Sequence, residues 1–557
     1  MKKILKIVFP IIIAFIAIQA SVILTFHQES NNNPLPSFYK KGVYHVHSIY
    51  SDGGGDINEI TQAASRDKLD FVILTDHGRP NRQSSQSTQW LHGVLLIGAS
   101  ELPLYSGHMT AAGYNLPAYM FPPEPQEAIN EVIKDQGICF IAHPFDLKIP
   151  WSDWDIENFT GIELLNSYYS SKMTSLIKTI ILPFQYLFGP SYALTSIIQY
   201  PEKEIKQWDA FLTHGKYSGI YALDAHARIP ITNNFQLNIP SYQSMFKIFT
   251  VYVKADHALD SNASSAASAV IASIKSGNFF DAIESIASAN GFDNYYLQSD
   301  RKRIDMGGNS EQPGGTLVFI LPFSFPTDIF IKKDGKIFKH IIQNTQKELF
   351  IPIGEPGVYR AEIFVPQNRF HNLPWLVTNP FFIGIKEKKR GAETFTLQNI
   401  LLNKDNYFQI EKNEHTQAGQ SYEWTNDHQV RVNFNFKLQK EPSGDVNFWA
   451  ALSHREPKDF SHFKGIIFKV KGSRRMRLLL QFRTLANQTE NAYQHSFLVD
   501  KEWTAITIPF HKFHQLYGNN NQLPELTQIT SFFILIDNSN AFPGAKGSIT
   551  LTEFGLY

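Results

Sequence analysis

The sequence predicts a multidomain protein: an α/β barrel, then two all-β sandwich domains, all preceded by an N-terminal transmembrane helix. With 557 residues the chain is too long for one hydrophobic core. Between Tyr44 and about Arg228, strand-like apolar runs alternate with helix-compatible segments, which is typical of an α/β domain. From Thr316 onwards, residues that alternate between polar and apolar predict strands of sandwich domains.

The first 26 residues predict a signal anchor. From Ile4 to Phe26 almost every residue is apolar, which is enough to cross a bilayer. Lysines at positions 2, 3 and 6 predict a cytoplasmic start, with the catalytic part on the periplasmic or extracellular side of the inner (cytoplasmic) membrane. The alternative is secretion after signal cleavage at Ala20-Ser21. We favour an uncleaved, single-pass anchor because Val22-Ile23-Leu24 prolongs the apolar run.

Composition and turn residues predict the domain boundaries that follow. They are a linker at 27–37, a barrel at 38–300, a small β-sandwich at 301–385, a basic linker at 386–393 and a jelly roll at 394–557. Barrel helices are expected at Ile57–Lys68, Pro125–Gln136 and around Ser264–Ser276. In the small sandwich, Asp334-Gly335 predicts a tight hairpin. In the jelly roll, 466–470 and 478–483 predict strands.

Charge and cysteine content exclude several classes of protein. Lys+Arg and Asp+Glu both number 51, so the chain as a whole offers no electrostatic case for binding nucleic acid. Its one cysteine, Cys139, excludes an internal disulfide and a thiolate zinc cluster. Because Cys139 lies within an apolar strand, we expect a packed thiol rather than a nucleophile.

Potential metal ligands follow five apolar runs. They are His45 and His47 after Val43-Tyr44, Asp76 and His77 after 71–74, Glu101 after 94–97, His143 after 138–142, and Asp224 and His226 after 219–223. In an α/β barrel the carboxyl ends of the strands meet at one mouth, so these side chains are expected to converge there. His45 and His47, two apart on a strand, project from the same face. The set predicts a metal-dependent hydrolase.

Other polar residues near these runs also have predicted roles. Asp52 lies on a glycine-rich turn from which its carboxylate can fold back to the mouth, and Asp76 is predicted to orient a ligand imidazole. Arg79 and Arg228 each directly follow a ligand loop, where a guanidinium can clamp a phosphate oxygen; the alternative is a solvated surface position. Glu163 ends a strand and is expected to face the mouth without being a ligand, where it forms a hydrogen bond either to substrate or to a ligand residue.

The ordered motifs resemble those of the polymerase and histidinol phosphatase (PHP) superfamily. The matching residues are His45-Val-His47-Ser-x-x-Ser-Asp52-Gly, Thr-Asp76-His77, Glu101, His108, Ala-His143-Pro and Asp224-Ala-His226. The resemblance implies a distorted (β/α)7 barrel with three divalent metal ions. It implies His45, His47, Glu101 and Asp224 on a first ion, Glu101, His108 and His143 on a second, and Asp52, His77 and His226 on a third. Ligands without sulfur fit zinc, manganese or iron.

Two further resemblances concern the β-domains. Pro356–Arg360 and Pro374–Pro380 resemble the CehA/McbA-like metallohydrolase branch of that superfamily, whose barrel is followed by a β-domain. Gln494–Phe510 resembles galactose-binding-like jelly rolls of the CIA30 and carbohydrate-binding type. The second resemblance implies a glycan as a partner, although aromatic residues in such domains are mostly core.

The apolar stretch Leu176–Tyr200 predicts a lid beside the mouth. Pro183 and Gly189-Pro190 argue against a second straight membrane span. One interpretation is a buried cap packed on the barrel. The other is a segment that dips into the outer leaflet and selects an amphiphilic or envelope-derived ester as substrate.

Three functions are compatible with the sequence. The leading one is a membrane-anchored phosphoesterase, acting on a phosphomonoester or phosphodiester with a metal-bridging hydroxide. The second is hydrolysis of a carboxylic or carbamic ester or an amide by the same water, as the CehA-like resemblance implies. The third is a non-catalytic envelope scaffold that binds glycans, which the complete ligand set disfavours because buried imidazoles and carboxylates are costly to keep.

Overall fold

The computed structural model describes Ser21 and most residues from Phe38 onwards. The described ranges after Ser21 are 38–167, 176–232, 235–255, 258–385, 395–401, 409–412, 417–418, 421–426, 428–437, 449–455, 458–486, 489–516, 524–541 and 546–557. Apart from Ser21, the predicted anchor (1–26) and both predicted linkers (27–37 and 386–393) lie outside these ranges. Among the described residues, no helix combines the length and the apolar character needed to cross a membrane.

The chain divides into two compact units. Unit 1 comprises residues 1–115 and 129–389, and unit 2 comprises 116–128 and 390–557. The segment 116–128 lies inside the range predicted for the barrel, yet it belongs to unit 2. There, the Glu124 carboxylate accepts hydrogen bonds from the Ser496 backbone N–H and hydroxyl at 2.8 and 2.5 Å, and Glu127 pairs with Arg477. Sequence periodicity carries no sign of this exchange, because it depends on contacts across about 370 residues.

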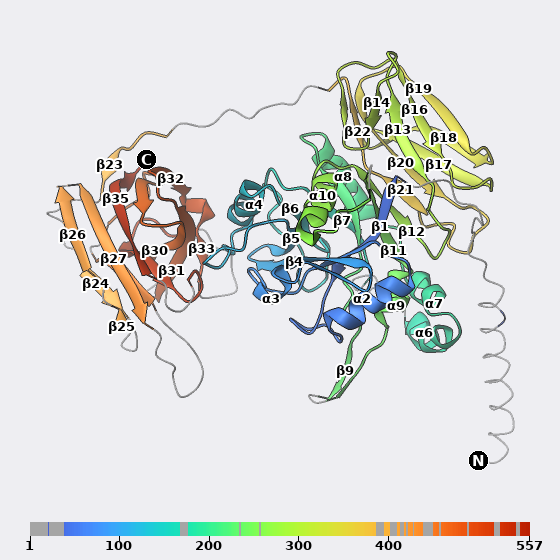
Figure 1. The fold of residues 1–557 in the computed structure, drawn as a ribbon. Helices are drawn as coiled ribbons and strands as arrows, with labels where there is room; N and C mark the ends of the chain where they lie inside the picture. The colour runs from blue at the N-terminus through green and yellow to red at the C-terminus, as the bar shows by residue number, and fades with distance from the viewer. Residues whose placement is uncertain are drawn as a thin grey trace. The chain divides into compact units, whose positions relative to one another are not determined.

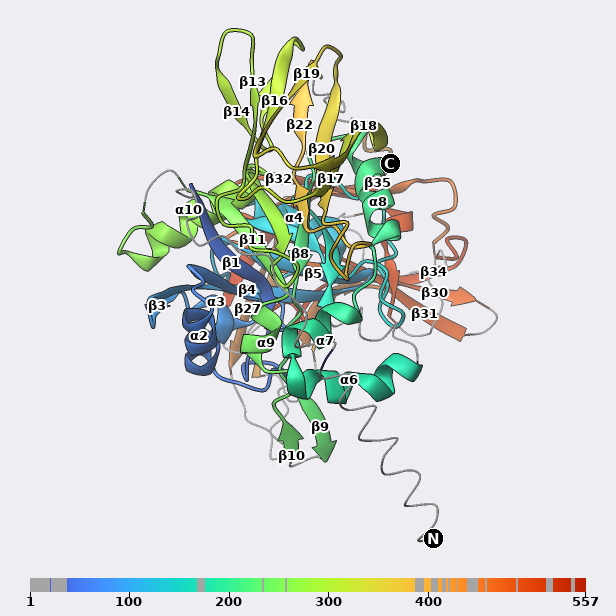
Figure 2. The same cartoon turned by 90° about the vertical axis from the view of Figure 1, so that its right-hand side faces the viewer.

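Seven strands of unit 1 form the barrel around the metal-site candidates (Figures 1 and 2). In sheet order they are β1 (Tyr39–Val46), β2 (Phe71–Leu74), β4 (Val94–Leu104), β5 (Gly107–Ala112), β6 (Ile138–Ile141), β7 (Gly161–Asn166) and β8 (Ser218–Ala222). Hydrogen bonds from the Leu223 and Ala225 N–H groups to the Tyr44 and His45 carbonyls close the ring. Only β5 among the seven runs antiparallel to its sheet neighbours, so the α/β barrel is distorted.

The α-helices found in the described ranges lie mainly between these strands. They are α2 (Ile57–Arg66), α3 (Arg82–Ser85), α4 (Pro125–Lys134), α6 (Leu176–Phe188), α7 (Pro190–Ser196), α8 (Glu202–Leu212), α9 (Tyr242–Phe246) and α10 (Ala263–Lys275). All three helices predicted by residue range are present within two residues of their expected ends. α2 begins where the Asp56 carboxylate accepts hydrogen bonds from the Asn58 and Glu59 N–H groups, a capping box. α10 packs Val270 and Ile274 against the barrel strands.

The remaining strands of unit 1 extend the barrel sheet and add a second one. They are β3 (Gln89–Leu91), β9 (Ile229–Thr232), β10 (Phe235–Leu237), β11 (Phe249–Lys254), β12 (Phe279–Ile283), β13 (Asp293–Leu297), β14 (Arg303–Asp305), β15 (Asn309–Ser310), β16 (Gly315–Ile320), β17 (Thr327–Lys333), β18 (Lys336–Asn344), β19 (Glu348–Ile353), β20 (Gly357–Phe364), β21 (Leu376–Thr378) and β22 (Phe381–Ile383). The predicted small sandwich shares a sheet with the barrel, because β21 pairs with β12. The predicted hairpin joins β17 to β18, with Asp334 and Gly335 both at positive φ.

Unit 2 is a sandwich of two antiparallel sheets. Its strands are β23 (Asn399–Ile400), β24 (Gln409–Lys412), β25 (Gln417–Ala418), β26 (Ser421–Asn426), β27 (Gln429–Lys437), β28 (Trp449–His454), β29 (Gly465–Gly472), β30 (Met476–Ala486), β31 (Thr489–Val499), β32 (Thr504–Pro509), β33 (His514–Gln515), β34 (Ile529–Asp537) and β35 (Lys546–Leu556). The two sheets, β25-β27-β35-β29-β32 and β24-β28-β34-β30-β31-β33, enclose one apolar core. Both predicted strands are confirmed, within β29 and β30, and so is the predicted sandwich.

The structure bears on two sequence predictions about single segments, and meets the first in full and the second in part. Cys139 is fully buried in β6, and burial raises the pKa of its thiol to about 12, as expected of a packed thiol. The predicted lid breaks at Gly189 into α6 and α7. Tyr192 and Leu194 of α7 are buried, whereas Leu187 of α6 is exposed, so the buried-cap interpretation describes only the second helix.

Asp281 on β12 gives a pH-dependent prediction. Burial raises the pKa of this carboxyl well above its usual range, against the effect of the Tyr221 N–H, which donates to Oδ1 at 2.9 Å. The folded state therefore keeps a proton that the unfolded chain loses above about pH 3.9. The contribution of Asp281 to the free energy of unfolding is therefore fully present below that pH, and it is lost as the pH rises towards the pKa of the folded state. Urea unfolding should show Asp281→Asn to be more stable than the wild type at pH 8, by about 1.4 kcal/mol per unit of pKa difference, and not at pH 4.

Asp305→Asn is the matched control, because the pKa of Asp305 is shifted in the opposite direction from that of Asp281. Its carboxylate is partly buried, but Arg303 and Lys254 hold its pKa below the usual range. Its ionised form therefore stabilises the fold above about pH 3.9, and that contribution is lost on acidification. The variant should be less stable than the wild type at pH 8. A loss of stability in Asp281→Asn at pH 8 would contradict the prediction.

Candidate metal centre

Nine histidine, aspartate and glutamate side chains meet at the mouth of the barrel. They come from the end of β1 (His45) and the segment after it (His47, Asp52), from β4 and β5 (Glu101, His108), and from the segments after β2, β6 and β8 (His77, His143, Asp224, His226). All of the residues predicted as ligands are thus brought together, and their donor atoms form overlapping groups.

The first donor group consists of four side-chain atoms, from His45, His47, Glu101 and Asp224, that lie close enough together to bind one ion. His45 Nε2 lies 3.1 Å from His47 Nε2, and these nitrogens lie 3.6 and 3.3 Å from Asp224 Oδ1 and 3.3 and 3.2 Å from Glu101 Oε2. Bonds of about 2.0–2.1 Å to a tetrahedral ion place neighbouring donors roughly 3.3 Å apart. The four donor atoms therefore have the separation that one ion of this kind requires.

Glu101 joins this group to a second one. Its Oε1 lies 2.9 Å from His108 Nδ1 and 3.0 Å from His143 Nε2. Its Oε2 is buried among the nitrogens of His45, His47 and His77 at 3.1–3.3 Å, yet has no aligned hydrogen-bond donor among the described residues. A buried carboxylate oxygen without a donor is costly, and a cation between it and the imidazoles removes that cost. The two oxygens of Glu101 thus face two different donor groups, as a bridging ligand must.

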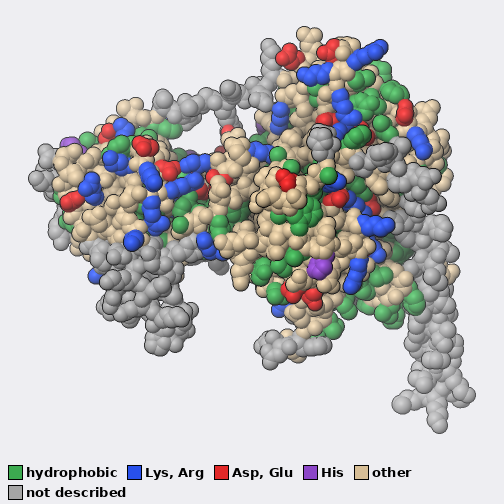
Figure 3. Space-filling model, viewed as in Figure 1, with side chains coloured by type: hydrophobic (Ala, Val, Ile, Leu, Met, Phe, Trp, Pro, Cys, Tyr) green, Lys and Arg blue, Asp and Glu red, His purple; other side chains and the backbone are tan. Residues whose placement is uncertain are grey.

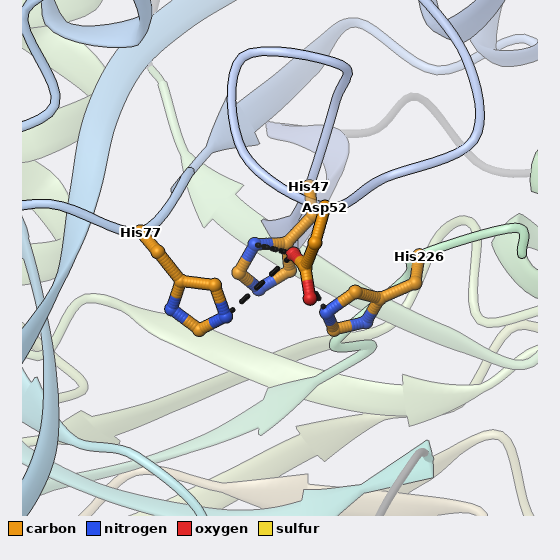
Figure 4. Close-up of side chains that lie close together, drawn as sticks. All are labelled: His47, Asp52, His77 and His226. Carbon is orange, nitrogen blue, oxygen red and sulfur yellow. Dashed lines mark ion pairs between the residues drawn. The ribbon is translucent and has the colours of Figure 1, made fainter. Parts of the chain in front are cut away.

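The third group gathers around Asp52 (Figure 4). Asp52 Oδ1 lies 3.2 Å from His226 Nε2, 3.6 Å from His77 Nε2 and 3.7 Å from His47 Nδ1. The rings of His47 and His77 each present their other nitrogen towards Glu101. The imidazoles of His47 and His77 therefore each face two donor groups, one at Asp52 and one at Glu101. The resemblance implied only one ion for each of these two residues.

The backbone at three of these residues is in the left-handed region. His45, His143 and Asp224 have φ values of 66°, 29° and 51°. Such values are uncommon for residues other than glycine and cluster at functional sites. They also correct the expectation that His45 and His47 are a same-face pair on a regular strand. The pairing of β1 with β2 shifts register between Val43 and Val46, and that irregularity turns both imidazoles to the same point.

Without a cation, protonated imidazoles balance the carboxylates. Burial disfavours the imidazolium of His45, but Glu163, Asp224 and Glu101 outweigh it and raise the pKa of His45 well above its usual range. In the same way the pKa of His143 is raised to about 9, against burial, chiefly by Glu101. Burial opposes ionisation of Glu101, yet the charge of His45 and hydrogen bonds from His108 and His143 hold its pKa well below the usual range.

Glu163 fixes the orientation of a ligand from outside the donor groups. Its Oε1 accepts a 2.6 Å hydrogen bond from His45 Nδ1, while its Oε2 accepts from the His143 backbone N–H at 2.9 Å and from Asn166 Nδ2 at 3.1 Å. A proton on Nδ1 leaves the lone pair of His45 Nε2 directed at the first donor group. The sequence predicted Glu163 at the mouth, either bound to substrate or in contact with a ligand residue, and its contacts with His45 and His143 support the second alternative.

Asp76 acts differently from its prediction. It accepts hydrogen bonds from the Ser48 N–H at 2.7 Å, the Ser48 hydroxyl at 2.8 Å and the Ser51 hydroxyl at 2.6 Å. None of these donors is an imidazole. Asp76 therefore holds the loop that carries Asp52, and in the described structure Glu163 orients the imidazole instead.

The two arginines lie at the edge of the centre. Arg228 is exposed and donates from Nη1 to the Asp52 carbonyl at 3.2 Å, so its guanidinium stays next to the third donor group. Arg79 is half-buried directly after the His77-Gly78 turn. Their predicted part in binding phosphate stays a prediction.

Fold and site thus define a multidomain protein with a barrel, β-sandwiches and histidine and carboxylate clusters that could hold metal ions. A family model described as complex I intermediate-associated protein 30 (CIA30) matches residues 421–546. This match confirms the resemblance predicted from Gln494–Phe510 and concerns the C-terminal sandwich alone. No curated protein matches the chain.

Solved structures resemble different parts of the chain. A two-domain protein from Bacteroides vulgatus, said to contain a predicted PHP-like metal-dependent phosphoesterase, is 16% identical and covers 64% of this chain and 99% of its own, with a TM-score of 0.31. The family 11 carbohydrate-binding module of the cellulase Lic26A-Cel5E of Clostridium thermocellum is 15% identical and covers 30% of this chain and 95% of its own, with a TM-score of 0.22. Values this low assign no function to the present chain. The CehA/McbA-like branch stays a prediction.

Proposed function

We propose that this chain is a metal-dependent hydrolase whose substrate is a phosphoric ester, either a monoester or a diester. The observation that carries the proposal is the Glu101 carboxylate. One of its oxygens contacts His108 and His143, and the other is buried among three imidazole nitrogens without a hydrogen-bond donor among the described residues. Such a site supports binding of more than one divalent ion.

The residues that would hold ions are the nine that converge at the mouth. They are His45, His47, Asp52, His77, Glu101, His108, His143, Asp224 and His226. Divalent ions bound by such a set lower the pKa of water towards neutrality and polarise a phosphoryl or carbonyl oxygen. Zinc, manganese and iron all fit these imidazole and carboxylate ligands.

The protein supplies orientation and charge around that centre. Glu163 holds His45 and the backbone of His143 in place, and Asp76 holds the loop that carries Asp52. Arg228, next to Asp52 and exposed at the edge of the site, offers a guanidinium that can pair with two phosphate oxygens. This placement favours an anionic substrate over a neutral ester.

The proposal is tested by assaying the full chain, loaded with zinc, manganese or iron, on nitrophenyl phosphate, bis-nitrophenyl phosphate and nitrophenyl acetate. We expect turnover of a phosphate ester, more than one ion per chain by elemental analysis, and loss of both turnover and bound metal in His143→Ala. His340→Ala, on β18 away from the centre, is the control and should keep both.

The same assay separates the rival functions. Faster cleavage of the acetate would favour the carboxylic or carbamic ester and amide hydrolases of the CehA type. Stoichiometric metal binding without any turnover would favour a glycan-binding scaffold. Glycan binding by the C-terminal sandwich stays a separate prediction, to be tested on the full chain because residues 116–128 belong to that unit.

A further inference from the structure

Two neighbouring elements of unit 1 expose an unusual number of large apolar side chains. They are Phe184, Leu187 and Phe188 of α6 and Ile229, Ile231, Leu237 and Ile239 of the β9–β10 hairpin and its end, together called the α6–hairpin surface. Leu187 is 77% and Ile231 54% exposed. Single exposed apolar residues are ordinary, but a group on adjacent elements indicates a surface that binds a partner or a membrane. Figure 3 shows hydrophobic side chains at the surface where Figure 1 labels α6 and α7.

Hydrogen bonds hold α6 against the end of the hairpin. The Tyr186 hydroxyl on α6 accepts a 2.9 Å hydrogen bond from the Ser241 N–H and lies 2.8 Å from the Ser244 hydroxyl. Only Asn238, Ile239 and Pro240 stand between the hairpin and Ser241. In both ribbon views α6 and the hairpin lie towards the same side of unit 1 (Figures 1 and 2). The apolar side chains therefore belong to one region of the unit.

This region adjoins the metal centre. Tyr242, which directly follows Ser241, donates from its hydroxyl to the His47 carbonyl at 2.8 Å. Gln236 of β10 donates to the Gly54 carbonyl at 3.5 Å, and the Gly54 N–H donates to the His226 carbonyl at 2.7 Å. A partner or membrane that binds to the α6–hairpin surface would thus lie beside the mouth of the barrel.

The two segments lack negative charge. No acidic residue occurs between Glu163 and Glu202 or between Asp224 and Asp256, although Asp and Glu number 51 in the 557-residue chain. Their basic residues are Lys172, Lys178, Arg228, Lys247 and Lys254. Phospholipid surfaces are anionic, repel carboxylates and attract lysine and arginine. Of these basic residues, Arg228 is exposed beside the hairpin, whereas Lys247 pairs with Asp67 and Lys254 with Asp305. Exposed apolar side chains beside an exposed arginine, on segments without acidic residues, match the chemistry of such a surface.

We propose that the α6–hairpin surface inserts into the interface of a phospholipid bilayer, and that the centre beside it cleaves a phosphoric ester in the headgroup of a lipid of that bilayer. The second half rests on the proposed function. The apolar sequence Ile4–Phe26 supplies a second attachment to the same membrane, and two attachments bind far more firmly than one. A bound membrane would present headgroups, not acyl chains, to the metal centre.

The test uses the full chain reconstituted in vesicles of phosphatidylethanolamine and phosphatidylglycerol. A nitroxide label is attached to a cysteine introduced at Leu187 or Ile231. The native Cys139 does not compete, since it is fully buried and the pKa of its thiol is raised to about 12. Relaxation by oxygen, which enters the bilayer, is compared with relaxation by a polar nickel complex, which stays in water.

We expect both labels to be relaxed more strongly by oxygen than by nickel. A label at Phe350, an apolar residue of β19 that is 59% exposed, is the control and should behave as an aqueous site. If the labels at 187 and 231 respond like the one at 350, the surface does not contact lipid. If neither reagent reaches them, another part of the chain covers them. Either result overturns the proposal.

The substrate half has its own measurement. Ile231→Glu should lower the ratio of phospholipid hydrolysis in vesicles to hydrolysis of soluble nitrophenyl phosphate severalfold, and Phe350→Glu should not. An unchanged ratio would overturn the lipid substrate. Because insertion is measured without turnover, a chain that inserts but hydrolyses no ester would refute the proposed function and leave the membrane surface intact.

Discussion

Replacing Glu101 by glutamine should remove at least one ion per chain and lower turnover by more than a hundredfold. The carboxylate faces His108 and His143 with one oxygen and His45, His47 and His77 with the other. An amide keeps one acceptor but turns an N–H donor towards one of the two groups, so it cannot bridge them. Losing a partner outside the ligand shell typically costs 10–100-fold, and loss of a shared ligand is expected to exceed this.

Glu284→Gln is the matched control for this variant. Glu284 is also a buried carboxylate of unit 1, and it pairs with Lys41 and accepts from the Tyr252 hydroxyl. Its replacement should affect stability but neither the metal content nor the turnover of the folded protein. Elemental analysis and the nitrophenyl phosphate assay measure both quantities. Full metal content in Glu101→Gln would refute the bridging role.

Replacing Glu163 by glutamine should weaken metal binding by roughly 10–100-fold while the ligands themselves remain. The amide can still accept the proton of His45 Nδ1 or that of the His143 N–H, but not both, because its nitrogen is a donor. Metal titration of the chelated protein measures the affinity. Because the ligands are intact, excess metal should restore turnover in Glu163→Gln, whereas it should not in Glu101→Gln.

Recovery of turnover in excess metal shows that Glu163 positions the ligands, because a variant with a damaged fold would not recover. A Glu163→Gln chain that binds metal with unchanged affinity but turns over slowly would show that Glu163 acts on the substrate instead. An unfolded variant is recognised by its urea midpoint, to be compared with that of Asn166→Ala, which removes the longest of the three contacts of Glu163 and leaves the carboxylate in place.

The sequence alone predicted six of the seven barrel strands, two strands of unit 2, three helices, one hairpin and, apart from His108, the converging side chains. Each of these follows from local information. A short apolar run ends at a polar residue, and parallel strands that end at one mouth bring such residues together. His108 is the exception, since it lies on β5, an antiparallel strand that the periodicity did not reveal, and only the superfamily resemblance indicated it.

Only the tertiary structure decided which atoms face one another. It paired the imidazole of His45 with Glu163 and Asp76 with the Ser48 loop, placed His47 and His77 between donor groups, and moved residues 116–128 into the second unit. These results depend on the register shift in β1, on the left-handed backbone at His45, and on hydrogen bonds between residues up to hundreds of positions apart. The periodicity of the sequence indicates which face of a strand a residue occupies. The direction in which a ligand side chain points depends on backbone angles, which the neighbouring strands impose.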